Sequence, residues 1–160
     1  MLLSLLKKRV GFTLVELMVV IAIIGTLSGI AVPIFGNYLD RARVARAKSE
    51  IRTIEKEILS FKMQRDRFPT DLAEIGLDGM LDPYKNPYQY QISTYTNKKG
   101  KVMKNPEARK DHNLVPVNTD FDLYSMGKDG ESKAPFTAKV SRDDIVRAND
   151  GQFIGLVIAY

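Results

Sequence analysis

The fold is decided by residues 11–39, which read GFTLVELMVVIAIIGTLSGIAVPIFGNYL. Glu16 is the one charged residue in this stretch, and the 23 positions of residues 17–39 carry no charge. At about 1.5 Å per helical residue this run would be roughly 35 Å long, enough to cross a hydrocarbon core of about 30 Å. We therefore predict that residues 12–39 form a membrane-spanning helix.

Glu16 is the residue in this span that most needs an explanation. A charged side chain at the centre of a membrane helix costs about 2.5–3.5 kcal/mol on insertion scales, so a carboxylate here must either reach water or find a partner. One interpretation is that Glu16 snorkels to the membrane interface. The other is that it pairs with a cation and has a functional role.

A basic cluster of Lys7, Lys8 and Arg9 precedes the span, which predicts a cytoplasmic N-terminus and residues 40–160 on the opposite side. An ordinary signal peptide has an apolar region of about 7–15 residues and then a small-residue cleavage site. The run here is longer, although residues 29–31 would permit conventional cleavage. A plain uncleaved anchor is a further alternative.

Helical periodicity continues beyond the span, over residues 40–64. Apolar residues recur at alternating intervals of three and four, which places them on one helix face. They are Val44, Ala47, Ile51, Ile54, Ile58 and Phe61. A coiled coil would need a longer repeat, so we expect this stripe to pack on a sheet of the same chain. The helix should end near Gln64.

Composition limits the remaining possibilities. The chain of 160 residues has no cysteine, which excludes disulfides, thiol catalysis and cysteine-based zinc sites. Its formal net charge of +5 includes three charges from the basic cluster, so removal of residues 1–11 would leave +2. This near-neutral remainder argues against a dedicated nucleic-acid-binding protein.

Residues 65–160 read as a globular α+β head. Residues 68–76 predict a short helix with Thr70 as N-cap and Gly76 at its end. Three strands are predicted over residues 88–95, 121–125 and 153–158. We expect them to form a small antiparallel sheet on which the apolar helix stripe packs.

The segment from Lys7 to Glu16 resembles the class III leader and first residues of type IV pilins and type II secretion pseudopilins. The resemblance implies a pilin fold, cleavage by a prepilin peptidase between Gly11 and Phe12, and N-terminal methylation of Phe12. Cleavage creates an amine one helical turn from Glu16, which can pair with its own terminus or with that of a neighbour. The resemblance implies the pairing between subunits. It also matches Pro33, where the missing N–H weakens the helix and gives it local flexibility.

Motifs in the head are similar to those of the major pseudopilin of type II secretion systems. They are FPT at 68–70, DP at 82–83, NPYQY at 86–90 and FDLYSMG at 121–127. The similarity covers residues 7–92 and 120–150 and departs at 93–119, which we interpret as an inserted hairpin or loop. Adhesive pilins more often carry a disulfide loop, which this chain cannot form.

This resemblance implies a filament subunit that waits in the inner membrane and assembles into a periplasmic pseudopilus. The implied partners are copies of the chain, minor pseudopilins, the prepilin peptidase, a platform protein, an assembly ATPase and membrane lipid. A type IV pilus subunit for motility, adhesion or DNA uptake is the alternative. A membrane-anchored calcium-binding receptor that never polymerises is a third possibility.

An acidic loop follows the motif at 127–130. The major pseudopilin binds Ca²⁺ in a loop at this place, and by position the resemblance implies Asp129, Asp143 and Asp144 as ligands. Clustered carboxylates and carbonyls suit this ion, which takes six to eight oxygens. The alternative is a solvated acidic turn.

Two further patterns carry less information. A basic segment comprises Lys98, Lys99, Lys101, Lys104, Arg109 and Lys110. It could contact phosphates, but we interpret it as a solvated loop and expect no nucleic-acid partner. His112 follows Asp111 without a serine or cysteine partner motif, and no P-loop is present. We therefore do not expect an enzyme.

Overall fold

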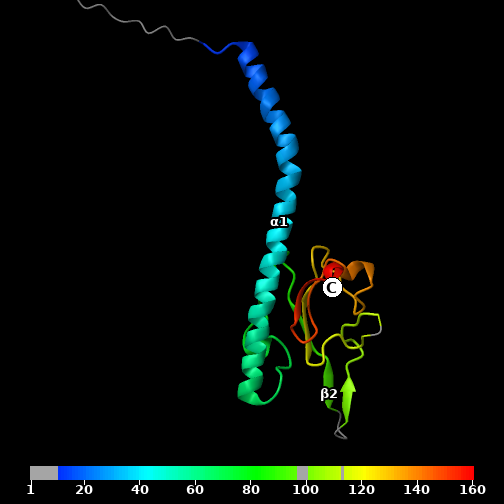
Figure 1. Cartoon of the computed structure of the whole chain (residues 1–160). Coiled ribbons are helices and arrows are strands. Elements are labelled where there is room, and N and C mark those ends of the chain that lie inside the picture. The colour runs from blue at the N-terminus through cyan, green and yellow to red at the C-terminus, as the bar shows by residue number, and fades with distance from the viewer. Residues whose placement is uncertain (1–10, 97–100, 113) are drawn as a thin grey trace, which may run out of the picture. The chain divides into compact units, whose positions relative to one another are not determined.

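A computed structural model describes residues 11–96, 101–112 and 114–160 (Figure 1). Most of the predicted leader, including the basic cluster, lies outside these residues, as do Lys98 and Lys99. The structure divides into two compact units at Asp40 and Arg41, and the long helix contributes to both.

The helices and strands follow one another along the chain in one order. They are α1 (Leu14–Arg65), η1 (Ala73–Ile75), β1 (Gln89–Ile92), β2 (Thr94–Thr96), β3 (Val102–Lys104), β4 (Phe121–Ser125), η2 (Lys139–Ser141), β5 (Ile145–Ala148), β6 (Phe153–Leu156) and η3 (Val157–Ala159). The end of α1 lies one residue beyond the predicted position, and α1 runs through Pro33 without a break.

The head contains a four-stranded antiparallel sheet in the order β1-β4-β5-β6. Most of the predicted stripe on α1 packs against one face of this sheet, with Val44 partly buried beside it, whereas Phe61 is not part of this core. Ala47, Ile51, Ile54 and Ile58 are fully buried there and share one core with residues of β1, β4 and β5. The α+β class and the packing of the helix on the sheet are thus confirmed.

A second apolar cluster covers the opposite face of the sheet. It contains Val117, Phe136, Val146, Ala148 and Val157. Because side chains alternate along a strand, β5 sends Val146 and Ala148 into this cluster and Ile145 into the other. The sheet is therefore buried on both faces, which places β5 at the centre of the head.

Several sequence-based predictions need correction. The strand predicted at 153–158 ends at Leu156, after which the 3₁₀ turn η3 begins. The strand predicted at 88–95 is interrupted at Ser93, and β2 pairs with β3 in a separate hairpin within the inserted segment (Figure 1). The strand β5 was missed, since its four residues include Arg147 and do not alternate between apolar and polar. The short helix is a single 3₁₀ turn, and its N-cap position is Leu72, not Thr70. Its end at Gly76, with φ of 72°, is confirmed.

Candidate functional site

The first turn of α1 is closed by hydrogen bonds between Thr13 and Glu16. The Glu16 carboxylate accepts from the backbone N–H of Thr13 at 2.8 Å and from its hydroxyl at 2.7 Å. The Thr13 hydroxyl oxygen in turn accepts the Glu16 N–H at 3.2 Å. This reciprocal capping box satisfies polar groups that a helix N-terminus leaves open, and it fixes where the carboxylate lies.

Gly11 and Phe12 directly precede this capped turn. Phe12 is 81% exposed, and Gly11 is also exposed. The structure therefore brings together the predicted cleavage junction, Gly11–Phe12, and the predicted assembly carboxylate of Glu16. In the uncleaved chain the Phe12 nitrogen belongs to a peptide bond, so the predicted amine exists only after processing.

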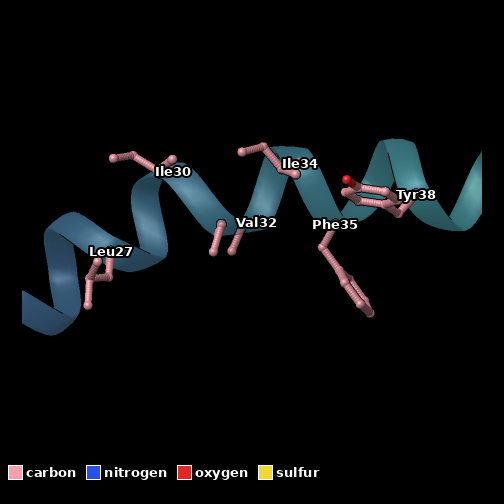
Figure 2. Close-up of a pocket in the computed structure, with 7 residues that line it drawn as sticks. Leu27, Ile30, Val32, Ile34, Phe35 and Tyr38 are labelled. Atoms are coloured by element: carbon pink, nitrogen blue, oxygen red, sulfur yellow. The ribbon is translucent and has the colours of Figure 1, made fainter.

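The first half of α1 is apolar on all sides. Among the described residues, α1 is the helix long and apolar enough to cross a membrane, with a window of mean hydropathy 2.5 and no buried residue. Figure 2 shows apolar side chains around Pro33 projecting from several sides of the helix, so they do not enclose a ligand cavity; those labelled are Leu27, Ile30, Val32, Ile34, Phe35 and Tyr38. A helix that is hydrophobic all round needs an apolar environment, which lipid or other helices can supply.

Two glycines in this half leave its surface open. A Cβ atom added to Gly25 or Gly29 would meet nothing within 4 Å. Small residues at this spacing allow helix backbones to approach closely in lipid. The span is therefore suited to contact other helices of its own kind.

In the head, the predicted calcium loop is held together by hydrogen bonds within the chain. Asp143 Oδ2 accepts the backbone N–H groups of Lys128 at 2.8 Å and Asp129 at 3.2 Å. Asp129 Oδ1 accepts the N–H of Glu131 at 2.9 Å. Gly127 has φ of 66°, and a Cβ there would lie 2.6 Å from Asp143 Oδ2, so this close approach requires glycine.

Asp144 lies apart from these surface contacts and is fully buried. Its Oδ2 accepts from Arg109 Nη2 at 2.6 Å and from the Ser132 hydroxyl at 2.6 Å. Burial raises the pKa of the Asp144 carboxyl to about 6, while Ser132 and Arg109 act in the opposite direction. The Asp144 carboxyl therefore lies against a permanently charged guanidinium, with which it forms a buried ion pair.

The described residues contain no group of three or more His, Asp or Glu side chains that could hold a metal. Asp129 and Asp143 are joined through backbone amides, whereas Asp144 is occupied by a guanidinium. These residues, as arranged, do not fit the six to eight oxygen ligands of Ca²⁺. Calcium binding stays a prediction of the resemblance, which melting with and without a chelator and calcium titration can test.

Arg109 is the buried structural residue that sequence reasoning misplaced. It was assigned to a solvated basic segment, yet it is 2% exposed. The available signal was its chemistry, since it is the one arginine in a run of lysines. A planar guanidinium is suited to buried, multidentate pairing in a way that an ammonium is not. His112, by contrast, is exposed and contacts Asp111 through Nδ1 at 2.8 Å.

A second buried arginine network joins α1 to the sheet. Arg147 on β5 donates from Nε to Glu55 of α1 at 2.7 Å and from Nη2 to Asp120 at 2.7 Å. Its Nη1 also donates to the Phe121 carbonyl oxygen at 3.0 Å. Sequence periodicity could not find this network, because Glu55 appeared to belong to the solvated side of the helix.

An α+β head on a long N-terminal helix, with the first half of that helix apolar on every side, defines the pilin-like class of proteins. Residues 35–142 match the family model of type II secretion system protein G, and residues 6–32 match the prokaryotic N-terminal methylation motif. The chain belongs to the type II secretion system protein G family.

Individual relatives agree with this assignment. The type II secretion system core protein G of Pseudomonas aeruginosa is 32% identical over 129 residues, covering 78% of this chain and 87% of the relative. Core protein G of Escherichia coli is 32% identical over 128 residues, covering 78% and 85%. The type IV major pilin protein PilA of Myxococcus xanthus is 37% identical over 83 residues, covering 52% and 36%. No solved structure matches the chain significantly.

Proposed function

We propose that this protein is the major structural subunit of a type II secretion pseudopilus and has no catalytic activity of its own. The observation that carries the proposal is a folded head of the protein G family attached to a helix whose first half is fully exposed and apolar. Such a surface is unfavourable in water, because burial of apolar surface lowers the free energy by roughly 25 cal/mol per Å². Lipid covers it before assembly, and neighbouring helices cover it afterwards.

The subunit is stored in the inner membrane with its N-terminus in the cytoplasm and its head in the periplasm. The basic cluster before the span supports this orientation. A prepilin peptidase cuts between Gly11 and Phe12 and methylates Phe12, and the match to the N-terminal methylation motif supports this step. The apolar half of α1 remains part of the mature chain of residues 12–160.

Glu16 sets the register of assembly. The new Phe12 amine is positive near neutral pH, and the Thr13 bonds hold the Glu16 carboxylate at the start of the helix. In a dry filament centre, a carboxylate facing the amine of a neighbour is stabilised far more than it would be in water. Pro33 supplies a position where α1 can adjust as it leaves lipid for the filament.

Growth of the filament moves folded cargo toward an outer-membrane channel. An assembly ATPase and a membrane platform protein supply the energy and the site of addition, and minor pseudopilins join the same fibre. We expect this protein to contact that machinery as a structural subunit. We expect no nucleic-acid partner. The inference to these partners rests on the protein G family.

The assembly step is tested by Glu16→Gln, with Glu57→Gln on the exposed side of the helix as the matched control. We expect Glu16→Gln to be processed and inserted normally but to form few fibres and to release little exoprotein. Glu57→Gln should behave as the wild type. Normal fibre yield from Glu16→Gln would refute the register argument.

Processing is tested by mass spectrometry of the membrane-extracted protein. We expect a chain that begins at N-methylated Phe12. A chain beginning at Met1, or at Val32 after conventional cleavage, would contradict the proposal.

A type IV pilus subunit is the second candidate, because the PilA relative shares 37% identity over 83 residues. The two functions differ in where the fibre ends and in what its loss prevents. Deletion should block exoprotein release if the chain is a pseudopilin. Loss of twitching or of long surface fibres, with secretion intact, would favour the pilus.

A further inference from the structure

The inserted segment and the C-terminal loop meet at Arg109. The backbone of this residue is fixed on both sides, since its N–H donates to Asp122 Oδ2 at 2.7 Å and its carbonyl oxygen accepts the Val117 N–H at 2.8 Å. The next residue, Lys110, exchanges backbone hydrogen bonds with the loop, donating to Ala134 at 3.0 Å and accepting from Phe136 at 2.9 Å. The guanidinium is therefore directed into the loop by a rigid frame.

The guanidinium binds several oxygens of the loop at once. Nη2 donates to Asp144 Oδ2 at 2.6 Å, and Nη1 donates to the Lys133 carbonyl oxygen at 2.9 Å and to the Ser132 hydroxyl. Its Cζ lies 4.3 Å from the ring centre of Tyr124. A carboxylate, a carbonyl and a hydroxyl converging on one buried positive charge are the kinds of ligand that a hard cation would use.

A divalent ion would have to share this place with a permanent cation. Arginine does not lose its proton in proteins, and its side chain here is 2% exposed. Within the described residues, Asp144 Oδ1 is the one buried carboxylate oxygen without a hydrogen-bond partner. One free oxygen falls far short of a calcium coordination shell, and the neighbouring Asp143 already receives two backbone N–H groups.

We infer that the Arg109 guanidinium takes the structural place of a divalent cation in the C-terminal loop, so that this head stays folded without calcium. The inserted segment supplies the charge from within the chain, which gives its residues around Arg109 a role in stability. Folding and filament supply should then be independent of the calcium concentration outside the cytoplasm. The inference concerns the head alone and does not depend on the proposed role in secretion.

The first test uses the full wild-type chain in detergent, melted in EDTA, in CaCl₂ and in MgCl₂. We expect the same midpoint in all three, and no heat of binding when CaCl₂ is titrated in calorimetry. A midpoint that falls in EDTA, or stoichiometric calcium binding, would overturn the inference. This test needs no variant, so it cannot be confused by misfolding.

The second test compares Arg109→Gln with Arg142→Gln, which makes the same change of charge at an exposed position beside the acidic pair. We expect Arg109→Gln to lower the midpoint by about 10 °C and Arg142→Gln to leave it nearly unchanged. Adding Asp144→Asn to Arg109→Gln should recover part of the loss, because the unpaired charge is then gone. Equal melting of the two single variants would show that Arg109 does not hold the loop. Neither result bears on whether the protein supports secretion, which the exoprotein assay measures separately.

Discussion

Replacement of Arg147 by methionine should weaken the attachment of α1 to the sheet and so lower the free energy of unfolding of the head. The Arg147 side chain is 1% exposed, and it joins Glu55 of α1 to Asp120 just before β4. Methionine keeps an apolar stem of similar length but removes every one of these bonds. It also removes the guanidinium that lies 4.1 Å from the ring centre of Phe121.

The expected cost follows from what the variant leaves behind. Removing one partner of a buried ion pair costs about 3–5 kcal/mol, since the remaining charge has no compensation. Arg52 Nη1 lies 3.3 Å from Glu55 Oε2 and can compensate part of this loss. We therefore expect the low end of that range, about 3 kcal/mol, which corresponds to a fall in midpoint of roughly 10 °C for a head of this size.

The matched control is Arg46→Met, which removes an arginine–glutamate pair from the same helix at a position where the arginine side chain is 66% exposed. Exposed pairs of this kind contribute about 0.3–0.5 kcal/mol. Unfolding should be followed by near-ultraviolet circular dichroism, because all tyrosines except Tyr38 lie after Arg41 and so report on the head. If Arg147→Met and Arg46→Met lose the same small free energy of unfolding, the buried network does not hold the helix to the sheet.

Three further perturbations test separate parts of the head by urea unfolding. Gly127→Ala places a side chain on a residue in the left-handed conformation and against the Asp143 carboxylate, so it should lower the free energy of unfolding by about 1–3 kcal/mol. The control Gly79→Ala, where space is open, should lower it by less than 1 kcal/mol. Equal losses would contradict the close approach of Gly127 to Asp143. Ile54→Ala empties a fully buried core position and should cost about 2–5 kcal/mol; a cost below 1 kcal/mol would mean that α1 does not pack as described. The hydrogen bond from Arg67 lowers the pKa of Glu74 from 4.5 to about 2, so its stabilisation is present above pH 4.5 and is lost as the pH falls toward 2. Wild type and Glu74→Gln should therefore differ at pH 7 and converge near pH 2, and a difference independent of pH would be inconsistent with this linkage.

Long periodic patterns were predictable because local physics decides them. The span requires an uncharged residue at every position, and the stripe requires an apolar residue at every third or fourth position. The structure places the stripe residues Ala47, Ile51, Ile54 and Ile58 in the core as expected. The strand β4 was also found from sequence, since its flanking turns and apolar content are typical of a strand. These elements suffice to predict an α+β head on a long helix, while the pilin fold was implied by the resemblance of the N-terminal segment to pilins and pseudopilins.

Single charged residues were not predictable, because their environment is made by parts of the chain that are distant in sequence. Arg147 is separated by 92 residues from Glu55, and Arg109 by 35 residues from Asp144. A basic residue in a polar segment is predicted to be solvated, because the local pattern does not show the distant carboxylate that folding brings next to it. For the same reason β5, with an arginine among its four residues, could not be identified as a buried central strand.

The sequence by itself determined the apolar half-helix with its acidic residue and the amphipathic continuation, because these depend on composition and spacing along one continuous segment, where each residue acts through its own hydrophobicity or helix geometry. The family was implied separately, by the resemblance of short motifs at the N-terminus and in the head. Only the tertiary structure decided which charges are buried and what neutralises them. Burial and pairing are properties of the assembled head, because the free energy of a buried charge depends on the partner that folding brings within hydrogen-bond distance.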